Sequence, residues 1–302
     1  MGTPDFAVPS LELLIRNGFQ ITAVVTAPDK PRGRGQEVTP TPVKEVALRH
    51  DLTLLQPESL TDPAFVSALR GREPDLIVVV AFRILPREIF TLPPLGSFNL
   101  HASLLPKYRG AAPINWAIIK GEVATGVTTF FLEEKVDTGN VLLQAEIPIA
   151  EDDDSGSLHD KLANLGAKVV LDTVTLIKSG QFHTTKQDST LACPAPKIFK
   201  EDCRIRWNQP AAQLRNFIRG LSPHPSAFTT HDGKVLKIYR TKVLAAHSSG
   251  PAGQLNVSES TLSVSTTDMQ LAIEDLQLEG RKRMTVDEFL RGYRTRTGDR
   301  FA

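Results

Sequence analysis

The sequence predicts an α/β protein of two domains, in which a mostly parallel sheet covered by helices precedes a small β-barrel or sandwich. The first half alternates short β-rich runs with helical patterns, as consecutive strand–helix–strand units do. The second half carries several short β-like runs separated by turn residues. The 302 residues are enough for two hydrophobic cores. We predict domains at residues 1–180 and 206–302, joined by a linker over 181–205.

The first residues of the chain predict a turn and then a helix. Residues 2–5 have the composition of a tight turn between a strand and a helix, with Pro9 near the start of that helix. Helical spacing continues through residues 10–18, and Gly18 is a natural stop. Only Met1 precedes the turn, so we expect either that the start lies a few residues late or that the sheet lacks its first strand.

Apolar and β-branched runs predict the strands of the first domain. The run at 75–81 is apolar almost throughout, which is typical of a strand buried on both faces. Further helices are predicted at 63–69 and 158–178, the latter with Ser155 or Ser157 as its N-cap. The predicted strands are residues 20–26, 75–81 and 126–132.

Two stretches without periodicity separate these elements. Residues 27–44 form a long loop rich in proline, glycine and charge, and loops of this length tend to be functional or disordered. The linker at 181–205 contains Pro194 and Pro196. Beyond it, a short helix is predicted at 211–220. The β-like runs that follow are residues 235–239, 253–257, 261–265 and 270–273.

Composition excludes several classes of protein. The longest apolar runs are far too short to span a bilayer, and the N-terminus lacks the features of a secretory signal. Cys193 and Cys203 stand in no metal-ligand or disulfide pattern, so we expect two reduced thiols and no metal. We therefore expect a cytoplasmic protein without a membrane partner, and a monomer.

The net charge of +1 hides an asymmetry along the chain. Residues 1–196 carry 18 Lys and Arg against 23 Asp and Glu, whereas residues 197–302 carry 17 against 11. The two parts therefore have formal charges of −5 and +6. A basic second half predicts contact with a polyanion, although an ordinary solvated surface also fits this balance.

Three side chains can converge on one reacting atom. Asn99 and His101 follow a strand-like stretch at 96–98, near the carboxyl end of a strand, where ligands bind in open α/β sheets. Their spacing of two points both to one side. Asp137, just beyond the run at 126–132, can reach the same crevice and orient the imidazole. From these residues alone, loop side chains that satisfy backbone groups remain an equal alternative.

The segment Asn99-Leu-His-Ala-Ser-Leu-Leu-Pro-Lys-Tyr-Arg-Gly110 resembles the signature of the 10-formyltetrahydrofolate-dependent formyltransferases, and Asp137-Thr-Gly139 resembles their second catalytic element. The resemblance implies a Rossmann-like catalytic domain and an OB-like C-terminal barrel. It also implies catalytic roles for Asn99, His101 and Asp137. Folate contacts are implied for Ser103, Leu104, Leu105 and Pro106, and more weakly for Ala81, Phe82, Arg83 and Ile84, where Phe82-Arg83 replaces the Tyr-Gly pair of many relatives.

The residue types suit formyl transfer. An amine attacks the formyl carbon on N10 of the folate, and negative charge develops on the formyl oxygen. The Asn99 amide and a protonated His101 can donate hydrogen bonds to that oxygen, while Asp137 keeps the imidazole charged and can pass the proton of the amine to the leaving nitrogen. The folate carries the formyl group, so no Ser or Cys nucleophile is needed.

The rest of the chain indicates the acceptor. Residues 2–11, 28–35, 40–44, 109–114, 200–207 and 276–284 resemble the members of this family that formylate the methionine on initiator tRNA. In those enzymes the loop inserted into the first domain enters the acceptor-stem region, and a basic C-terminal domain contacts the tRNA backbone. We therefore expect initiator Met-tRNA as partner. The expected tRNA contacts are Lys30, Arg32, Arg34, Lys44, Arg281, Lys282 and Arg283.

Three alternatives compete with this hypothesis. A formyltransferase for a small amine, such as a sugar nucleotide or glycinamide ribonucleotide, would leave the basic loop and the basic domain without a purpose. A nicotinamide-dependent oxidoreductase is disfavoured because no G-x-G-x-x-G follows a strand. A non-catalytic RNA-binding module is disfavoured by the intact Asn99, His101 and Asp137.

Overall fold

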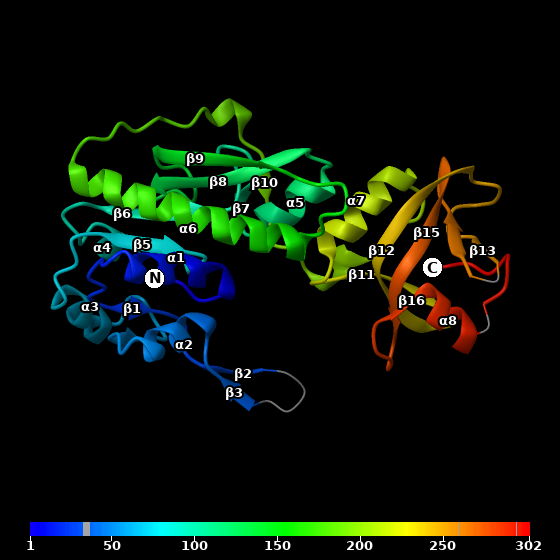
Figure 1. The fold of residues 1–302 in the computed structure, drawn as a ribbon, viewed down its shortest axis with the longest axis horizontal. Coiled ribbons are helices and arrows are strands. Elements are labelled where there is room, and N and C mark those ends of the chain that lie inside the picture. The colour runs from blue at the N-terminus through cyan, green and yellow to red at the C-terminus, as the bar shows by residue number, and fades with distance from the viewer. Residues whose placement is uncertain (33–36, 259, 294) are drawn as a thin grey trace. The chain divides into compact units, whose positions relative to one another are not determined.

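The computed structural model describes residues 1–32, 37–258, 260–293 and 295–302 (Figure 1). The chain forms two compact units. The first comprises residues 1–110, 125–147 and 159–194, and the second comprises residues 111–124, 148–158 and 195–302. Within the described residues, no helix has both the length and the apolar character needed to cross a membrane.

The centre of the first unit is a four-stranded sheet in the order β5-β6-β8-β9. β5 and β6 are parallel, with Val80 opposite Leu100, and β6 and β8 are antiparallel, with His101 opposite Thr128. The predicted parallel pairing is confirmed, but β8 runs against its neighbour, so this sheet is mixed. The strands are β5 (Ile77–Val80), β6 (Ser97–His101), β8 (Ala124–Phe131) and β9 (Val141–Pro148).

The start of the chain lies between two strands. β1 (Val24–Val25) pairs in parallel with β4 (Leu54–Leu55), so only two residues of the predicted strand at 20–26 pair. The Gly2 amide donates to the Val25 carbonyl at 3.0 Å, and the Val80 amide donates to the Met1 carbonyl at 2.9 Å. A Cβ at Gly2 would lie 2.7 Å from the Cβ of Ala7, so glycine is needed there. A cavity of about 140 Å³ borders Met1.

Helices cover the sheet of the first unit. Gly166 of α6 packs on Leu100 of β6, and the hydroxyls of Thr129 and Thr173 lie 2.8 Å apart, which fixes α6 against β6 and β8 (Figure 1). This helix begins at Ser155, and Asp154 accepts from the Ser157 amide, so the prediction of a serine N-cap was wrong. The helices are η1 (Asp5–Ala7), α1 (Val8–Arg16), α2 (Pro42–Arg49), α3 (Pro63–Arg70), α4 (Arg87–Phe90) and α6 (Ser155–Ser179).

The region predicted as one loop at 27–44 has regular structure. β2 (Lys30–Arg32) and β3 (Glu37–Thr39) pair as an antiparallel hairpin, with Lys30 opposite Thr39. α2 then begins at Pro42. Thr41 is its N-cap, because the backbone of Thr41 is extended and its hydroxyl accepts from the Lys44 amide, while Pro42 occupies the first turn. The proline and glycine content concealed these short elements.

The second unit is built on an antiparallel sheet in the order β11-β12-β15-β14-β13, with β16 beside β15. The predicted strands are confirmed and are antiparallel, but among the described residues no strand pairing joins β11 to β13, so the barrel stays a prediction. The strands are β11 (Ala227–His231), β12 (Lys234–His247), β13 (Leu255–Val257), β14 (Leu262–Ser265), β15 (Met269–Leu278) and β16 (Met284–Thr285).

Three helices complete the second unit. α7 (Ala211–Leu221) buries Leu214 and Ile218 in the core formed with the sheet. α5 (Pro113–Ile119) packs on α7, where the Asn115 amide donates to the Gly220 carbonyl at 2.8 Å. α8 (Val286–Gly292) begins with a capping box formed by Thr285 and Glu288 and buries Phe289.

The segment predicted as a linker contains short elements of its own. These are η2 (Ser189–Leu191), β10 (Pro194–Ala195) and η3 (Lys200–Cys203). β10 pairs with β7 (Arg109–Gly110), which follows the signature loop, residues 102–107 of the signature segment. Residues 181–194 of this stretch belong to the first unit and residues 195–205 to the second, a division that proline content and missing periodicity did not reveal.

Candidate active site

The end of β6 carries two of the predicted catalytic residues. Asn99 and His101 lie within β6 and not after it, as the sequence suggested, and they share one side of the strand. His101 is buried, whereas Asn99 is half-buried and its side chain makes no hydrogen bond to the described residues. Because β5 and β6 are parallel and end together, the residues after Val80 lie at the same edge as His101.

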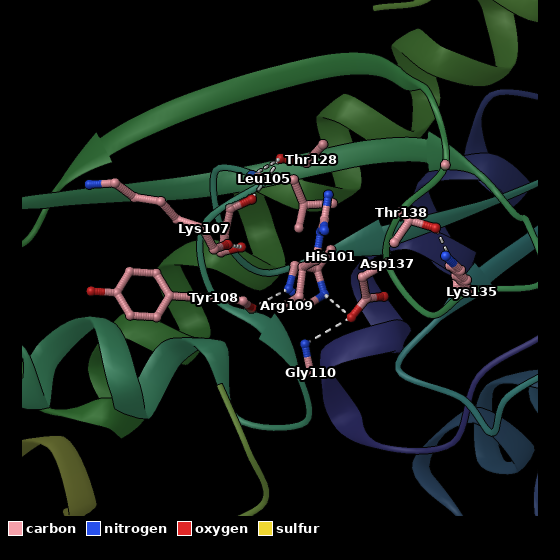
Figure 2. A network of polar contacts seen from close by, with 12 residues as sticks. His101, Leu105, Lys107, Tyr108, Arg109, Gly110, Thr128, Lys135, Asp137 and Thr138 are labelled. Atoms are coloured by element: carbon pink, nitrogen blue, oxygen red, sulfur yellow. Dashed lines mark hydrogen bonds and ion pairs between the residues drawn. The ribbon is translucent and has the colours of Figure 1, made fainter. Parts of the chain in front are cut away.

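Both ring nitrogens of His101 face protein groups. Nε2 lies 2.8 Å from the Tyr108 carbonyl oxygen, and Nδ1 lies 3.9 Å from Oδ2 of Asp137 (Figure 2). A carbonyl oxygen only accepts hydrogen bonds, so Nε2 carries a proton. The second distance is too long for a direct hydrogen bond, but it brings together two side chains that are only 6% and 11% exposed.

A tight turn after β8 positions Asp137. The backbone of Asp137 is left-handed, with φ of 56°, which a non-glycine residue adopts only when its surroundings hold it there. Its Oδ2 accepts from the Gly110 amide at 2.9 Å (Figure 2). The carboxylate is therefore fixed between the ring of His101 and the backbone that follows the signature loop.

The signature loop is held from within. The Ser103 hydroxyl donates to the Lys107 carbonyl at 2.6 Å, and the Leu105 amide donates to the Thr128 hydroxyl at 3.0 Å. Ser103 and Leu105 are buried, whereas Leu104 and Pro106 are half-buried. Of the four residues predicted to contact folate, the structure therefore leaves the side chains of Leu104 and Pro106 more accessible.

The segment at 81–84 follows β5 and presents a mixed surface. Ala81 is exposed with φ of 47°, and Ile84 is 74% exposed, which is unusual for so large an apolar side chain. Phe82 packs partly against the core. The Arg83 guanidinium donates to the carbonyls of Pro57 and Glu58, both at 2.8 Å, so it ties this segment to the neighbouring loop.

The residues predicted to contact tRNA from the first unit differ in their surroundings. Lys30 is exposed on β2 and forms no ion pair with a described residue, and Arg32 ends that strand. Arg34 lies outside the described residues. Lys44, on α2, forms an ion pair with Asp29, and this contact lowers the pKa of the Asp29 carboxyl. Lys44 thus has a partner within the chain, which the sequence did not reveal.

The basic residues of the second unit lie near the turn between β15 and β16. Arg281 and Lys282 are exposed and form no ion pair within the described part of the chain. Arg283 instead lies 2.8 Å from Asp275 and 4.3 Å from the centre of the Tyr239 ring. Its pKa is raised by the bond to Asp275. Arg281 and Lys282 are therefore more available than Arg283 to bind an anion from outside the chain.

The structure thus brings His101 and Asp137 together, with Asn99 on the same strand. It also adds groups that sequence reasoning missed: the Tyr108 carbonyl, the Gly110 amide and the Thr128 hydroxyl. Two of these are backbone groups, for which side-chain identity gives no signal. In the described ranges, no cluster of three or more His, Cys, Asp or Glu is arranged to hold a metal ion.

The chain is similar to known proteins over almost its whole length. A family model described as formyl transferase matches residues 1–174, and the model of the formyl transferase C-terminal domain matches residues 197–294. A methionyl-tRNA formyltransferase of Chlorobium limicola is 50% identical over 302 residues, which cover 97% of this chain and 95% of the relative. A methionyl-tRNA formyltransferase of Bacteroides fragilis is 48% identical over 303 residues, covering 97% and 94%.

Solved structures show the same fold at lower identity. The N-formyltransferase from Helicobacter canadensis, in complex with folinic acid and dTDP-3-aminofucose, superposes with a TM-score of 0.66. It is 19% identical, and the match covers 90% of this chain and 96% of that one. At this identity the likeness supports the fold alone.

Proposed function

The chain belongs to the formyl transferase family, and we propose that it transfers the formyl group of 10-formyltetrahydrofolate to the α-amino group of methionine on initiator Met-tRNA, in the initiation of protein synthesis. One observation carries the chemistry: the carboxylate of Asp137, only 11% exposed, faces the imidazole of His101 at the carboxyl edge of β6. The proposal includes a cytoplasmic location, because the initiation of translation takes place there.

The acceptor follows from sequence similarity across both units. Relatives that cover almost the whole chain at 47–50% identity are named for methionyl-tRNA. The sugar N-formyltransferases share the fold at 18–19% identity, so they support a small-amine acceptor far less. The exposed Lys30 on the hairpin and the +6 charge of residues 197–302 also favour a polyanionic acceptor.

In the reaction, the amine nitrogen bonds to the formyl carbon, the bond from that carbon to N10 breaks, and the proton lost by the amine ends on N10. 10-Formyltetrahydrofolate supplies the activated formyl group. The Asn99 amide, free of partners in the described chain, donates to the formyl oxygen as negative charge develops there. Nδ1 of His101 and the Asp137 carboxylate transfer the proton of the amine to N10, because Nε2 already donates to the Tyr108 carbonyl.

This assignment changes the role first expected for His101. A direct hydrogen bond from Nε2 to the formyl oxygen requires that the formyl oxygen replace the Tyr108 carbonyl. In the arrangement described here, the carbonyl fixes the tautomer and aims Nδ1 at Asp137. We therefore assign stabilisation of the oxygen to Asn99 and proton transfer to the pair formed by His101 and Asp137.

The folate and the tRNA take different surfaces in this proposal. The folate lies against Ala81, Phe82, Arg83 and Ile84 and against Ser103 to Pro106, because both segments follow strands that end at one edge and Ile84 offers exposed apolar surface. The tRNA contacts Lys30 and Arg32 of β2, Arg34, and Arg281 and Lys282 of the second unit, which we take to be an OB-like barrel. Lys44 and Arg283 shape those surfaces through Asp29 and Asp275.

The test compares three acceptors at equal concentration with 10-formyltetrahydrofolate: charged initiator tRNA, elongator Met-tRNA and free methionine. We expect transfer to initiator Met-tRNA to exceed transfer to either of the others by orders of magnitude in kcat/KM. Equal activity on all three would overturn the choice of acceptor but not the chemistry. The absence of formyl transfer to any of them would overturn both.

A further inference from the structure

A strap formed by residues 185–193 joins the two turns that hold Asp137. At one end, Thr185 and Val141 exchange backbone hydrogen bonds of 2.8 and 2.9 Å at the start of β9. At the other end, the Cys193 carbonyl accepts from the Arg109 amide at 3.0 Å, and its sulfur accepts from the Tyr108 amide at 3.3 Å. The strap therefore touches the turn before β9 and the turn that follows the signature loop.

Between these ends, the side chain of Gln187 points inward and uses both of its polar atoms. Nε2 donates to the carbonyls of Asp137 and Gly139, at 3.0 and 2.8 Å. Oε1 accepts from Nε and Nη2 of Arg109, at 3.1 and 2.7 Å. Gln187 is only 8% exposed, so these four bonds satisfy an amide that has little access to water.

We propose that Gln187 is a positioning residue for Asp137, and that it sets the distance between the Asp137 carboxylate and the imidazole of His101. The proposal rests on the proposed function for its kinetic consequences. Gln187 touches no reacting atom and acts through the turn at 137–139. That turn needs an external restraint because the backbone of Asp137 is left-handed. The restraint also keeps the Asp137 carboxylate 2.9 Å from the Gly110 amide that it accepts from.

The amide of Gln187 couples the two turns as one unit. Arg109 precedes Gly110, and Gly110 holds the carboxylate, so a shift of Arg109 moves the donor that Asp137 needs. Gln187 forms hydrogen bonds with both Arg109 and the backbone of Asp137, and so fixes their positions relative to each other. Misplacement of a catalytic group by about 1 Å can lower the rate about 100-fold. A loosened turn would therefore lower turnover without removing any substrate contact.

The experiment compares Gln187→Ala and Gln187→Glu with the matched control Gln181→Ala, an exposed glutamine of the same stretch. Gln187→Glu keeps the acceptor for Arg109 but loses both donors to the turn. We expect both Gln187 variants to lower kcat roughly 10- to 100-fold, with KM for folate and for Met-tRNA within about twofold of wild type. Gln181→Ala should match wild type.

A double-mutant cycle separates positioning from general stability. If Gln187 acts through Asp137, then Gln187→Ala adds little further loss in kcat to an Asp137→Asn chain. Multiplicative losses would overturn the proposal, as would raised KM values with an unchanged kcat. Either result would mean that Gln187 supports the fold or a substrate surface and does not position the carboxylate.

Hydrogen exchange gives a readout that needs no activity. The Gly110 amide donates to Asp137, so its exchange should quicken in Gln187→Ala and stay unchanged in Gln181→Ala. Unchanged protection in Gln187→Ala would overturn the inference even if wild type transfers formyl groups. Quickened exchange in a chain that lacks formyl transfer would instead overturn only the proposed function.

Discussion

The ring of His101 is held on both sides, and this decides what the residue can do. The Tyr108 carbonyl accepts a hydrogen bond from Nε2, and the Asp137 carboxylate lies opposite Nδ1. Neither partner is a reactive group of a substrate, so the protein itself sets the tautomer and direction of the imidazole. The half-buried Asn99, two residues earlier on the same side of β6, keeps its amide available.

Asp137→Asn tests the charge at this position. Asparagine keeps the size of the side chain and an acceptor for the Gly110 amide, so the fold should survive. Loss of the carboxylate should lower kcat about 10²- to 10⁴-fold, the range for a general acid–base group, while the Kd for Met-tRNA stays within about twofold. Single-turnover transfer and tRNA binding measure the two quantities.

The control for this variant lies in the same turn. Glu134→Gln removes an exposed carboxylate whose ion pair with Arg87 is also exposed, and it should leave kcat unchanged. Near-normal turnover in Asp137→Asn, or an equal loss in Glu134→Gln, would mean that the catalytic carboxylate has been misassigned.

In a chain produced to begin at Met1, the α-amino group predicts a dependence of stability on pH. Burial lowers its pKa from 8.0 to about 5, although Met1 as a whole is only half-buried. Between these values the unfolded chain binds a proton that the folded chain does not, so the free energy of unfolding rises with pH by up to about 1.4 kcal/mol per unit. This contribution is complete above pH 8 and lost below about pH 5.

Urea unfolding between about pH 5 and 8 measures this slope, with the N-acetylated chain as control. Acetylation removes the charge but keeps an N–H for the Val78 carbonyl, which the amino group reaches at 2.7 Å. Identical slopes for the two chains would contradict the assignment.

At the scale of elements, sequence reasoning found the strongly patterned segments and missed those fixed by neighbours. The apolar run at 75–81 and the helix at 63–69 correspond closely to β5 and α3. β9 was not predicted, because polar residues interrupt its apolar ones and because its pairing depends on β8. Propensity records local preference, whereas the partners of a strand are set by the whole chain.

The same limit applies to the site. Spacing and residue types predicted that Asn99, His101 and Asp137 face one crevice, and the structure brings His101 and Asp137 together with Asn99 on the same strand as His101. Gln187 stands 50 residues after Asp137 and belongs to no pattern that predicts contact. The Tyr108 carbonyl and the Gly110 amide would exist whatever side chains stood there. Only the fold brings these groups to the side chains of His101 and Asp137.

The turn before β9 should tolerate no side chain at Gly139. A Cβ there would lie 1.7 Å from the Phe131 carbonyl oxygen, so Gly139→Ala must displace the turn that carries Asp137. We expect the free energy of unfolding to fall by about 1–3 kcal/mol and kcat to fall with it. Gly71→Ala is the matched control, because its Cβ would meet nothing nearer than 3.4 Å. Equal stability of the two variants, measured by urea unfolding, would refute this packing.

Two lysines of the first unit should differ in role. Lys30, on β2, should bind the tRNA, whereas Lys44, on α2, should stabilise the fold. Lys30→Ala removes an exposed charge and should weaken Met-tRNA binding several-fold with an unchanged Tm. Lys44→Ala removes the partner of Asp29 and should lower Tm instead. Fluorescence anisotropy and thermal unfolding measure the two effects. The reverse pattern would show that Lys44, and not Lys30, contacts the tRNA.

Across the whole molecule, charge differs between the part that holds the candidate active site and the part proposed to bind tRNA. Residues 1–196 have a net charge of −5 and hold Asn99, His101 and Asp137, whereas residues 197–302 have a net charge of +6. Sequence-independent attraction of a nucleic acid depends on the number of phosphates neutralised, and each neutralised phosphate releases counterions. The affinity for Met-tRNA should therefore depend steeply on salt, whereas the single-turnover rate at saturating tRNA should not.

Arg281 and Lys282 allow this division to be measured, because both are exposed and neither forms an ion pair with a described residue. The double variant Arg281→Ala, Lys282→Ala should reduce the slope of log Kd against log salt by about 1 for each phosphate that is no longer neutralised. Its single-turnover rate at saturating tRNA should equal that of wild type. Arg70→Ala, Arg72→Ala, a double change at the exposed end of α3, controls for the change in net charge alone and should leave the slope unchanged. Equal changes in slope would mean that net charge, and not a surface on the second unit, attracts the tRNA.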